Sequence, residues 1–361
     1  MKLKKLFLIF ATVVFVATAC DPYKIEIPQQ PGSTNDGGNN DGGSDDGKED
    51  DGQSGPQNSV VYPEAGVPKT KTLLTTGYFR ENKLQTGITH YSFYGKDDVS
   101  GSHQNINVLE VDLNNEAYKV VFQMTSRSTT SAIGKSTKSI AAINAAYEQE
   151  AIYNRTNGVN HSQVTLASDH LRFWKHEGAI VGDGQRKVGM IYGAKGTKNH
   201  AEGGLQAIEI YKQLPEKNIF ASAPMLIDDY DPVGTRFVPS QYTINNVGSF
   251  DSEDYRRHQG GRNPRTAVAL TADNDLLFIT VDGRFTGKAE GMSCKELTNF
   301  LVKHFNPRWA LNMDGGGSTT MYIKGSGGQE DVVNHPCNSG STWDTHKQRE
   351  LSTFFLIQYN E

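Results

Sequence analysis

Hydrophobic and polar residues alternate along much of the chain after residue 100, and a period of two predicts β-strands. Asn107 to Leu113 and Tyr118 to Met124 alternate on either side of Asn114-Asn115, which predicts a hairpin. Residues 139 to 147 are mainly small and apolar, which predicts a buried strand ending at Asn144. Further strands are expected over residues 188–192, 205–211, 219–228, 309–313, 320–324 and 352–359.

One segment has a helical period instead. Ser293-Cys294-Lys295-Glu296 has the form of a capping box, and apolar residues recur at helical spacing until Asn306-Pro307 ends the run. Residues 265–270 and 276–281 precede it and flank Asp273-Asn274-Asp275, which predicts a second hairpin. Many strands and few helices indicate an α+β fold with a mostly antiparallel or mixed sheet.

The first twenty residues have the layout of an export signal. Lys2, Lys4 and Lys5 precede an apolar run, and residues 17–20 read Ala-Thr-Ala-Cys. The last four resemble a bacterial lipobox, with Ala17 where leucine is usual. We therefore expect a signal peptide over residues 1–19, with Cys20 as the lipidated first residue of a membrane-anchored lipoprotein of the cell envelope. An ordinary signal peptide with a chance cysteine is the alternative.

Residues 20–60 are expected to form a flexible acidic tether, because their Gly, Asp, Asn and Ser cannot bury enough apolar surface to fold. Residues 33 to 52 hold seven acids and one lysine, a balance of −6, whereas the whole chain carries −5. The remainder is therefore near neutral and has no basic footprint for nucleic acid. Residues 61–106 have weaker strand signals and are expected to be an appendage before a domain over 107–361.

Few other residues suggest chemistry by their spacing. Cys294 and Cys337 remain beyond the signal, and whether they pair is open. The histidines have no metal-ligand spacing, although His200, His258, His335 and His346 remain candidate acid-base helpers. Neither a Gly-x-Ser-x-Gly elbow nor a phosphate-binding Walker loop is found.

Two predicted strands end in an acid followed by glycine. Residues 276–281 lead into Asp282-Gly283-Arg284, and residues 309–313 lead into Asp314 and Gly315-Gly316-Gly317. A helix joins the two strands, so they should run parallel and open both loops at the same sheet edge. Ser318, Thr319 and the loop N–H groups would suit an anionic oxygen.

A third loop brings more positive charge to the same edge. Gly260-Gly261-Arg262-Asn263-Pro264 leads into Arg265, which starts the strand expected to pair with residues 276–281. Arg265 and Arg284 should therefore lie close together and form a cradle for a phosphate or carboxylate. Separate solvated arginines and ordinary glycine turns are the alternatives.

These loops together resemble one enzyme family. The resemblance rests on Asn263-Pro-Arg-Thr-Ala267, Asp282-Gly-Arg284, Gly291-Met292 before the Glu296-Leu297 helix, Ala310-Leu-Asn-Met-Asp-Gly-Gly-Gly-Ser-Thr319 and Val332-Val-Asn-His-Pro336. In that order they are similar to the phosphodiester glycosidase family, over roughly residues 107–361. Ile143-Asn144-Ala145-Ala146-Tyr147 departs from it, since alanines replace two glycines and would narrow the pocket.

The resemblance implies hydrolysis of a sugar-1-phosphodiester, with release of free sugar and a phosphomonoester. The catalytic residues it implies are Asp314, Asp282, Arg284, Arg265 and Glu290. The substrate-binding residues it implies are Asn144, Thr266, Asn312, Gly315, Gly316, Gly317, Ser318, Thr319, Asn334 and Arg349. The partner would be a phosphorylated carbohydrate, and no cofactor would be required.

Three alternatives remain open at this stage, and one of them is an ordinary glycosidase that acts on sugars without phosphate. Asp282, Asp314 and Glu290 with loop carbonyls would suit Ca²⁺ or Mg²⁺, although no contiguous acidic metal loop is present. A non-catalytic lipoprotein that binds phosphorylated or acidic glycans is also consistent with the sequence, because of the alanines at 145 and 146. The sugar and the group beyond the phosphate are not specified by the sequence.

Overall fold

Strands outnumber helices in the computed structural model, which describes residues 58–63, 72–147, 152–161, 170–197, 199–338, 343 and 347–360. These residues hold 16 strands and four α-helices, and the strand pairs are antiparallel. The expected α+β class is therefore confirmed. The helices are α1 (Thr130–Ser136), α2 (His200–Gln213), α3 (Tyr255–Gly260) and α4 (Cys294–His304).

The expected signal peptide, Cys20 and residues 20–57 of the tether lie outside the described residues, and these expectations stay predictions. The described residues belong to the unit Gln53–Glu361. Within the described part of the chain, no helix combines the length and the apolar character needed to cross a membrane.

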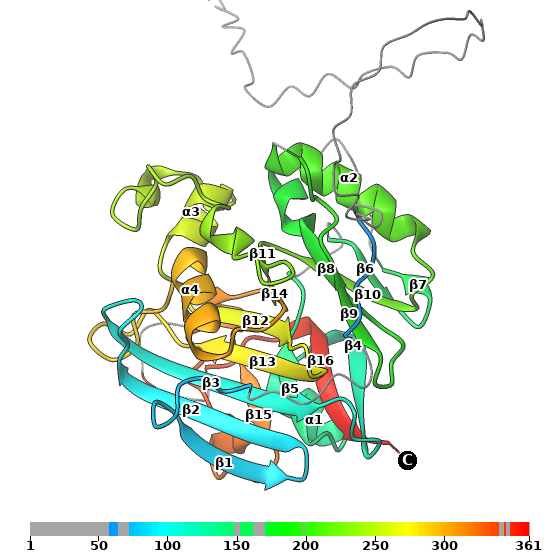
Figure 1. Cartoon of the computed structure of the whole chain (residues 1–361). Helices are drawn as coiled ribbons and strands as arrows, with labels where there is room; N and C mark the ends of the chain where they lie inside the picture. The colour runs from blue at the N-terminus through cyan, green and yellow to red at the C-terminus, as the bar shows by residue number, and fades with distance from the viewer. Residues whose placement is uncertain are drawn as a thin grey trace, which may run out of the picture. The chain divides into compact units, whose positions relative to one another are not determined.

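The strands form three sheets (Figure 1). The seven-stranded sheet has the order β1 (Arg80–Gln85), β2 (Ile88–Lys96), β3 (His103–Asp112), β13 (Asp275–Val281), β12 (Arg265–Leu270), β14 (Trp309–Asn312) and β11 (Met225–Ile227). The five-stranded sheet has the order β7 (Val159–Asn160), β6 (Asn154–Thr156), β10 (Asn218–Ser222), β8 (Gly178–Gly182) and β9 (Val188–Ile191). The four-stranded sheet has the order β15 (Met321–Ile323), β5 (Ala141–Asn144), β16 (Leu351–Tyr359) and β4 (Tyr118–Ser128).

The central strands of the seven-stranded sheet are buried on both faces because they carry apolar residues at odd and even positions. On β3, Ile106 and Val108 belong to the hydrophobic cluster that includes Phe300 of α4, which covers this face in Figure 1. Leu109 and Val111 belong to the cluster that the sheet shares with strands of the other two sheets. Burying such side chains stabilises the fold by about 1.5–3 kcal/mol each. The sheet is therefore a rigid base for the loops at its edge.

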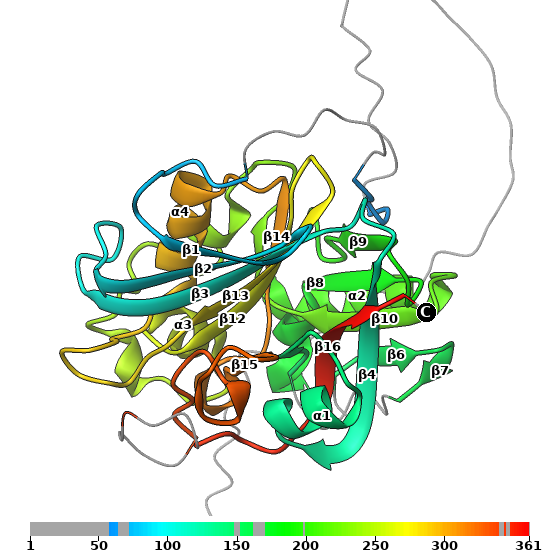
Figure 2. The same cartoon turned by 90° about the horizontal axis from the view of Figure 1, so that it is seen from below.

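The smaller sheets are covered by local helices. α1 lies beside β15 and β16 of the four-stranded sheet, as seen from below in Figure 2. On the five-stranded sheet, Ala179 and Ile219 pack with Ala207 and Ile208 of α2. Each helix thus covers a sheet face that would otherwise expose apolar side chains.

Several expected elements are confirmed. α4 begins with the expected capping box, in which Ser293 Oγ accepts from Glu296 N and the Glu296 carboxylate accepts from Ser293 N. β12 and β13 form the expected hairpin, with Leu270 paired to Leu276. The strands expected at 139–147, 188–192, 309–313, 320–324 and 352–359 correspond to β5, β9, β14, β15 and β16.

Three expectations about the elements are wrong or incomplete. Residues 107–124 form no hairpin, because β3 pairs with β2 and β13 whereas β4 pairs with β16 in another sheet. Residues 205–211 are part of α2, whose N-cap is Asn199 and whose buried Ala207, Ile208 and Tyr211 have helical spacing. Residues 219–228 split into β10 and β11 at Ala223-Pro224.

The boundary expected between residues 106 and 107 falls inside β3. Every residue of β13 pairs with a residue of β3, from Asp275 with Asp112 to Val281 with Ile106. β1 and β2 then continue the same sheet outward. The segment interpreted as an appendage therefore forms one side of the main sheet.

Candidate active site at the glycine loop

The two acid-glycine loops open at the same sheet edge. β13 and β14 are both antiparallel to β12, which lies between them, so they run parallel to each other and end at the same side. Asp282 directly follows β13, and Asp314 follows β14 by two residues. The expected convergence of these loops is confirmed.

Glycines let three loops close around Asn263-Pro264. A Cβ added to Gly283 would lie 2.6 Å from Pro264 N, and one on Gly291 would lie 2.5 Å from Asn263 O. A Cβ on Gly315 would lie 2.6 Å from Pro264 O. These distances are too short for any side chain, so the glycines are required for backbone packing.

Two arginines from different segments of the chain lie against the glycine loop. A Cβ on Gly316 would be 3.1 Å from Arg284 Nη2, and one on Gly317 would be 2.6 Å from Arg349 Nη2. Arg284 is exposed, has φ +66°, and donates from Nη2 to Asn263 Oδ1 at 3.0 Å. Arg349 is half-buried and donates from Nη1 to Ser318 Oγ at 3.3 Å. The positive charge expected at the loop therefore comes from Arg284 and Arg349.

Asp282 is 1% exposed and accepts several hydrogen bonds. Asn105 Nδ2 donates to Oδ2 at 2.7 Å, and the His335 backbone N–H donates to the same oxygen at 2.8 Å. Asn334 Nδ2 donates to Oδ1 at 2.8 Å. A carboxylate with so many donors is held in one orientation. Asp282 is thus suited to position other groups.

His335 is the group that Asp282 positions. Its Nδ1 lies 3.2 Å from Asp282 Oδ2 and 3.3 Å from Asn105 Nδ2. Because a carboxylate only accepts, the tautomer with a proton on Nδ1 satisfies the shorter contact and directs Nε2 away from Asp282. Trp343 stacks on the ring at 3.6 Å between centroids. From the sequence, His335 was one of four candidate acid-base histidines. Its position next to Asn334, in one of the segments that resemble the family, was the signal for a place in the site. Asn105 had no signal in the sequence.

Asp314 is half-buried, and its backbone is fixed from behind. Its N–H donates to Ala145 O at 3.0 Å, and its carbonyl accepts from Asn144 Nδ2 at 2.6 Å. The buried Met313 precedes it and the half-buried Gly315 and Gly316 follow it. Asp314 is therefore the acid of the two loops that retains more contact with solvent.

A buried polar network lies behind the loop. Asn144 Oδ1 accepts from Thr266 Oγ1 at 2.8 Å and from Thr320 N at 3.1 Å. Thr266 Oγ1 also lies 3.3 Å from Thr319 Oγ1. All four residues are at most 1% exposed. These side chains hold the loop in place. Their burial does not support the direct sugar contacts that were expected of Asn144, Thr266 and Thr319.

Asn312, Asn334 and Ser318 are also buried behind the loop. Asn312 Nδ2 donates to Ala223 O at 2.8 Å, and Asn334 joins Met321 N, Thr319 O and Asp282. Ser318 accepts from Arg349. Their side chains connect strands and loops within the protein. The substrate contacts that the sequence suggested for them are therefore not supported by this placement.

The loop N–H groups are less available than expected. Gly316 N donates to Pro264 O at 2.9 Å, Ser318 N to Gly315 O at 3.1 Å, and Thr319 N to Gly316 O at 3.3 Å. The last two bonds close the short 3₁₀ turn η4 (Gly316–Ser318), and the first joins this turn to the loop before β12. An anion at this loop would therefore meet arginine side chains in preference to these three N–H groups.

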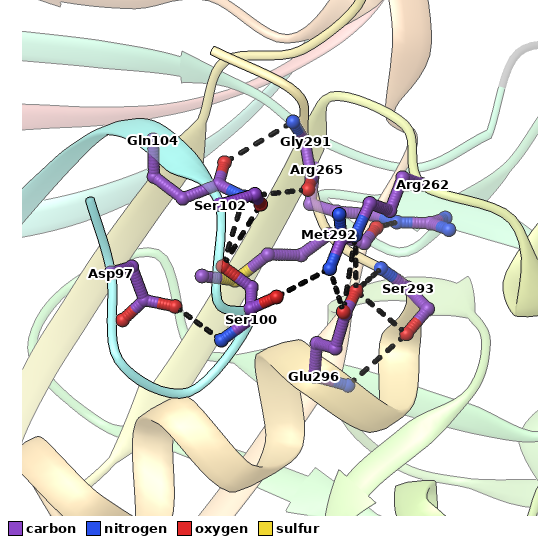
Figure 3. A network of polar contacts seen from close by, with 10 residues as sticks. All are labelled: Asp97, Ser100, Ser102, Gln104, Arg262, Arg265, Gly291, Met292, Ser293 and Glu296. Carbon is purple, nitrogen blue, oxygen red and sulfur yellow. Dashed lines mark hydrogen bonds and ion pairs between the residues drawn. The ribbon is translucent and has the colours of Figure 1, made fainter. Parts of the chain in front are cut away.

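Arg265 does not share a cradle with Arg284 as expected. Its side chain is 1% exposed and donates to Met292 O at 2.8 Å, Gly261 O at 2.8 Å and Gln259 Oε1 at 3.0 Å. Figure 3 draws its side chain with Met292, whose backbone oxygen accepts from Nε. Arg265 therefore anchors the loop that enters β12.

Glu290 also differs from its expected role. Its Oε1 accepts from Gly287 N at 2.7 Å, and its N–H donates to His103 O at 2.9 Å. The carboxylate closes a tight turn between Phe285 and Ala289. These contacts give no support to Glu290 as a third catalytic acid.

The β2–β3 loop is fastened to the start of α4 (Figure 3). Arg262 Nη2 forms an ion pair with Glu296 Oε1 at 2.6 Å, and Glu296 also caps the helix. Arg262 donates a further hydrogen bond to Ser100 O. Gln104 donates to Gly291 O at 2.8 Å and accepts from Gly291 N at 3.1 Å. The N-terminal strands are thus joined to the loops that build the site.

The alanines at 145 and 146 do not line a pocket. Both are at most 2% exposed and belong to the main hydrophobic cluster. Their methyl groups therefore fill the core, and the expected narrowing of the pocket is not observed. The binding-only hypothesis loses the feature that favoured it.

Cys294 and Cys337 are free and do not pair. Cys294 Sγ donates to Gln259 Oε1 at 2.8 Å, and burial raises the pKa of its thiol to about 11. Cys337 lies near Gly316 O and Arg284, and burial raises its thiol pKa although Arg284 and Arg349 act in the opposite direction. Both thiols therefore remain protonated at neutral pH.

Three other titratable groups are held in uncharged forms by burial. Burial lowers the pKa of His258 well below its usual range and that of His200 to about 4. Burial raises the pKa of Glu177 to about 8, although Tyr192 OH and Met225 N donate to its carboxylate. His346 lies outside the described residues.

A hard cation would find little space on Asp282. Its oxygens already accept from Asn105, Asn334 and His335. The residues described hold one geometric cluster of possible ligands, Asp97, Asp98 and His304, which does not include the loop acids. Ca²⁺ or Mg²⁺ binding by Asp282, Asp314 and Glu290 therefore has no support in this geometry.

Comparison with known proteins assigns this architecture to a class. A family model for phosphodiester glycosidases matches residues 137–358, and the chain belongs to that family. The match begins after β1–β3, so these strands lie outside it. Among curated protein sequences, no match to the chain is found.

Solved structures share the fold at low sequence identity. One is the zebrafish N-acetylglucosamine-1-phosphodiester alpha-N-acetylglucosaminidase catalytic domain auto-inhibited by its pro-peptide, with a TM-score of 0.51, 17% identity, and coverage of 84% of this chain and 88% of that one. A hypothetical protein from Synechocystis has a TM-score of 0.50, 13% identity, and coverage of 78% and 64%. At these identities the likeness concerns the fold alone.

Proposed function

We propose that this protein hydrolyses a sugar-1-phosphodiester at the glycosidic bond and releases free sugar and a phosphomonoester. The observation that carries the proposal is the convergence of Arg284 and Arg349 on Gly316-Gly317, next to the half-buried Asp314. Membership of the phosphodiester glycosidase family supports the same reaction class.

In the proposed reaction the arginines hold the phosphate. Guanidinium groups bind phosphate oxygens with paired donors, and Arg284 and Arg349 approach the loop from different segments. The bond between the anomeric carbon and the phosphate oxygen breaks, and that oxygen keeps the electron pair. The arginines stabilise the charge that develops on it, which lowers the barrier to departure.

Asp314 supplies the carboxylate for the anomeric carbon. It acts either as a nucleophile, with retention of configuration after water attacks the intermediate, or as a base for water, with inversion. His335, oriented by Asp282, exchanges protons through Nε2 with the attacking water or the departing phosphate. Water contributes its oxygen to the sugar, and its proton is released.

Attachment to a membrane through lipidated Cys20 belongs to the same proposal. The apolar signal and the acidic tether of the sequence support an envelope location. The phosphorylated carbohydrate would then be met outside the cytoplasm. Labelling of the chain with a radioactive fatty acid, lost in Cys20→Ser, tests this part independently of catalysis.

The test of the reaction is an assay on a panel of sugar-1-phosphodiesters with matched aryl glycosides. Free sugar and phosphomonoester are both quantified, and the anomeric configuration of the first product is read by NMR. Equal release of the two products from diesters, with little release from aryl glycosides, is expected. Equal rates on both classes would indicate an ordinary glycosidase, and tight binding of diesters without release would indicate a binding protein.

A further inference from the structure

A groove of mixed polar and apolar lining lies beside the candidate active site. It is lined by residues of β1–β3, which lie outside the family match, and by residues 326–335, which lie within it. It has a volume of about 570 Å³, and its lining includes Arg80, Ser92, Tyr94, Asn107 and His335. Small-molecule sites in proteins have volumes of about 300–1,000 Å³. The groove is therefore large enough for an organic ligand.

Strand register connects the groove to the active site. Ser92 of β2 pairs with Asn107 of β3, Asn107 pairs with Thr280 of β13, and Thr280 pairs with Thr266 of β12. Directly paired residues lie on the same face of a sheet. A row of polar side chains thus runs from the groove to the network behind the glycine loop.

A second row reaches Asp282. Tyr94 pairs with Asn105, and Asn105 donates through Nδ2 to Asp282 Oδ2 at 2.7 Å. Asn105 and His335 line the groove while they contact Asp282. The groove and the candidate site therefore share two side chains.

Asn107 holds a buried donor that the protein itself does not use. Asn107 is 2% exposed, and its Nδ2 has no hydrogen-bond partner among the described residues. Its Oδ1 lies 3.0 Å from His90 Nε2, which therefore donates and leaves His90 Nδ1 as an acceptor. A buried donor without a partner is unfavourable, and a ligand oxygen in the groove would accept from it.

Aromatic rings form one side of the path between groove and site. Tyr94 is 61% exposed, and its ring centroid lies 6.0 Å from that of Trp343. Trp343 in turn stacks on His335. Exposed aromatic faces favour ligands that present both C–H surface and hydroxyl groups.

The charge of the lining favours a neutral ligand. The described lining residues include one arginine, Arg80, and no carboxylate. Burial lowers the pKa of His90, and Arg80 acts in the same direction, so the imidazole is neutral at pH 7. The polar part of the lining consists of amides, hydroxyls and imidazoles, which suit sugar hydroxyls, and its apolar part consists of Leu84, Phe93, Val332 and Val333.

We propose that this groove binds a neutral saccharide segment of the substrate that extends beyond the phosphodiester held at the glycine loop. Hydroxyl groups bind Asn107, Ser92 and His90, and the C–H face of a sugar ring packs on Tyr94. The proposal rests on the proposed function for its link to the phosphodiester. The binding of the saccharide itself does not depend on turnover.

The test is calorimetric titration of the full chain with mannotriose, cellotriose and chitotriose, with inorganic phosphate as a charged comparison. At least one trisaccharide is expected to bind, and Tyr94→Ala is expected to weaken its binding by at least tenfold. Asn107→Ala is expected to weaken it as well. Tyr230→Ala, which removes another exposed tyrosine at 44% exposure, is the matched control and should bind as the wild type does.

Two results would overturn the groove proposal: no binding of any trisaccharide, or unchanged binding in Tyr94→Ala. Tyr94 is exposed, so its variant carries the test even where Asn107→Ala folds poorly. Hydrolysis of short phosphodiesters without trisaccharide binding would remove the groove proposal alone. Trisaccharide binding that Tyr94→Ala abolishes, without hydrolysis of any diester, would instead remove the proposed reaction.

Discussion

The two sides of the glycine loop use similar residue types for different purposes. Behind the loop, Asn144 and Thr266 are fully buried and hydrogen-bond within the protein. In front of it, Asp314 and Arg349 are half-buried and Arg284 is exposed. Polar residues of the predicted site are thus divided into buried groups that hold the loop and solvent-facing groups that would contact a ligand.

This difference shows why a motif does not by itself identify reacting groups. A buried polar side chain with satisfied partners stabilises one loop conformation, and its loss costs folding free energy. A solvent-facing charged group makes fewer contacts that stabilise the fold, so its loss mainly reduces stabilisation of the transition state. Measurements of activity and stability on the same variants separate these cases.

The largest effect is expected for Asp314→Asn. Loss of the carboxylate should lower kcat/KM by about 10³-fold, because the anomeric centre loses its nucleophile or base. The free energy of unfolding should change little, since the backbone contacts of Asp314 remain. Steady-state kinetics and urea unfolding check both, and normal turnover would show that Asp314 is not the reacting acid.

Arg284→Ala comes next, with an expected loss of about 10²-fold in kcat/KM through weaker stabilisation of the phosphate. Arg284 is exposed, so the unfolding midpoint should stay near that of the wild type. The control is Arg236→Ala, which removes an arginine 59% exposed and paired with Asp231. Equal activity of the two variants would contradict phosphate binding by Arg284.

For the buried side, Asn144→Ala should lower the free energy of unfolding by about 2–3 kcal/mol. The change leaves Thr320 N–H and Thr266 Oγ1 without their shared acceptor. Denaturant unfolding measures the loss. A variant that unfolds like the wild type but shows a raised KM would place Asn144 on the substrate instead.

A fourth prediction concerns Glu177, whose pKa burial raises from 4.5 to about 8. Between these values the unfolded chain has released the proton that the folded protein keeps, so stability falls as pH rises, by about 1.4 kcal/mol per pH unit. Glu177→Gln should remove this slope. Urea unfolding of both proteins at pH 5, 6.5 and 8 tests it, and parallel curves would contradict the raised pKa.

The smallest effect is expected from chelation. The Asp282 oxygens accept from Asn105, Asn334 and His335, so removal of divalent cations should change the rate less than twofold. The assay is run with and without EDTA after dialysis. A rate restored specifically by Ca²⁺ or Mg²⁺ would return the loop acids to the role of metal ligands.

Local patterns were sufficient where one segment contained the determining interactions. The capping box of Ser293 and Glu296 is a four-residue signal, and the β12–β13 hairpin depends on adjacent strands. The 205–211 segment was assigned incorrectly because its apolar residues also suit a strand, whereas the cap at Asn199 lies outside it. Such errors arise where the decisive residue is beyond the segment considered.

The positions of the site loops were predicted better than the contacts of their side chains. The direction of β13 and β14 followed from the helix between them, which brought Asp282 and Asp314 together. The burial of Arg265 and the contacts of Asn105 depend on segments distant in sequence. No spacing within one strand encodes such contacts, so the supporting and reacting groups could not be separated in advance.

The sharing of the main sheet between β3 and β13 has a practical consequence for protein engineering. A gene trimmed to the family match at residue 137 would delete β1–β3, all of β4 and α1. β13, whose seven residues are all buried, would then become an exposed edge with unpaired N–H and C=O groups. Long apolar edges recruit other chains, so such a fragment should precipitate where the longer protein stays in solution.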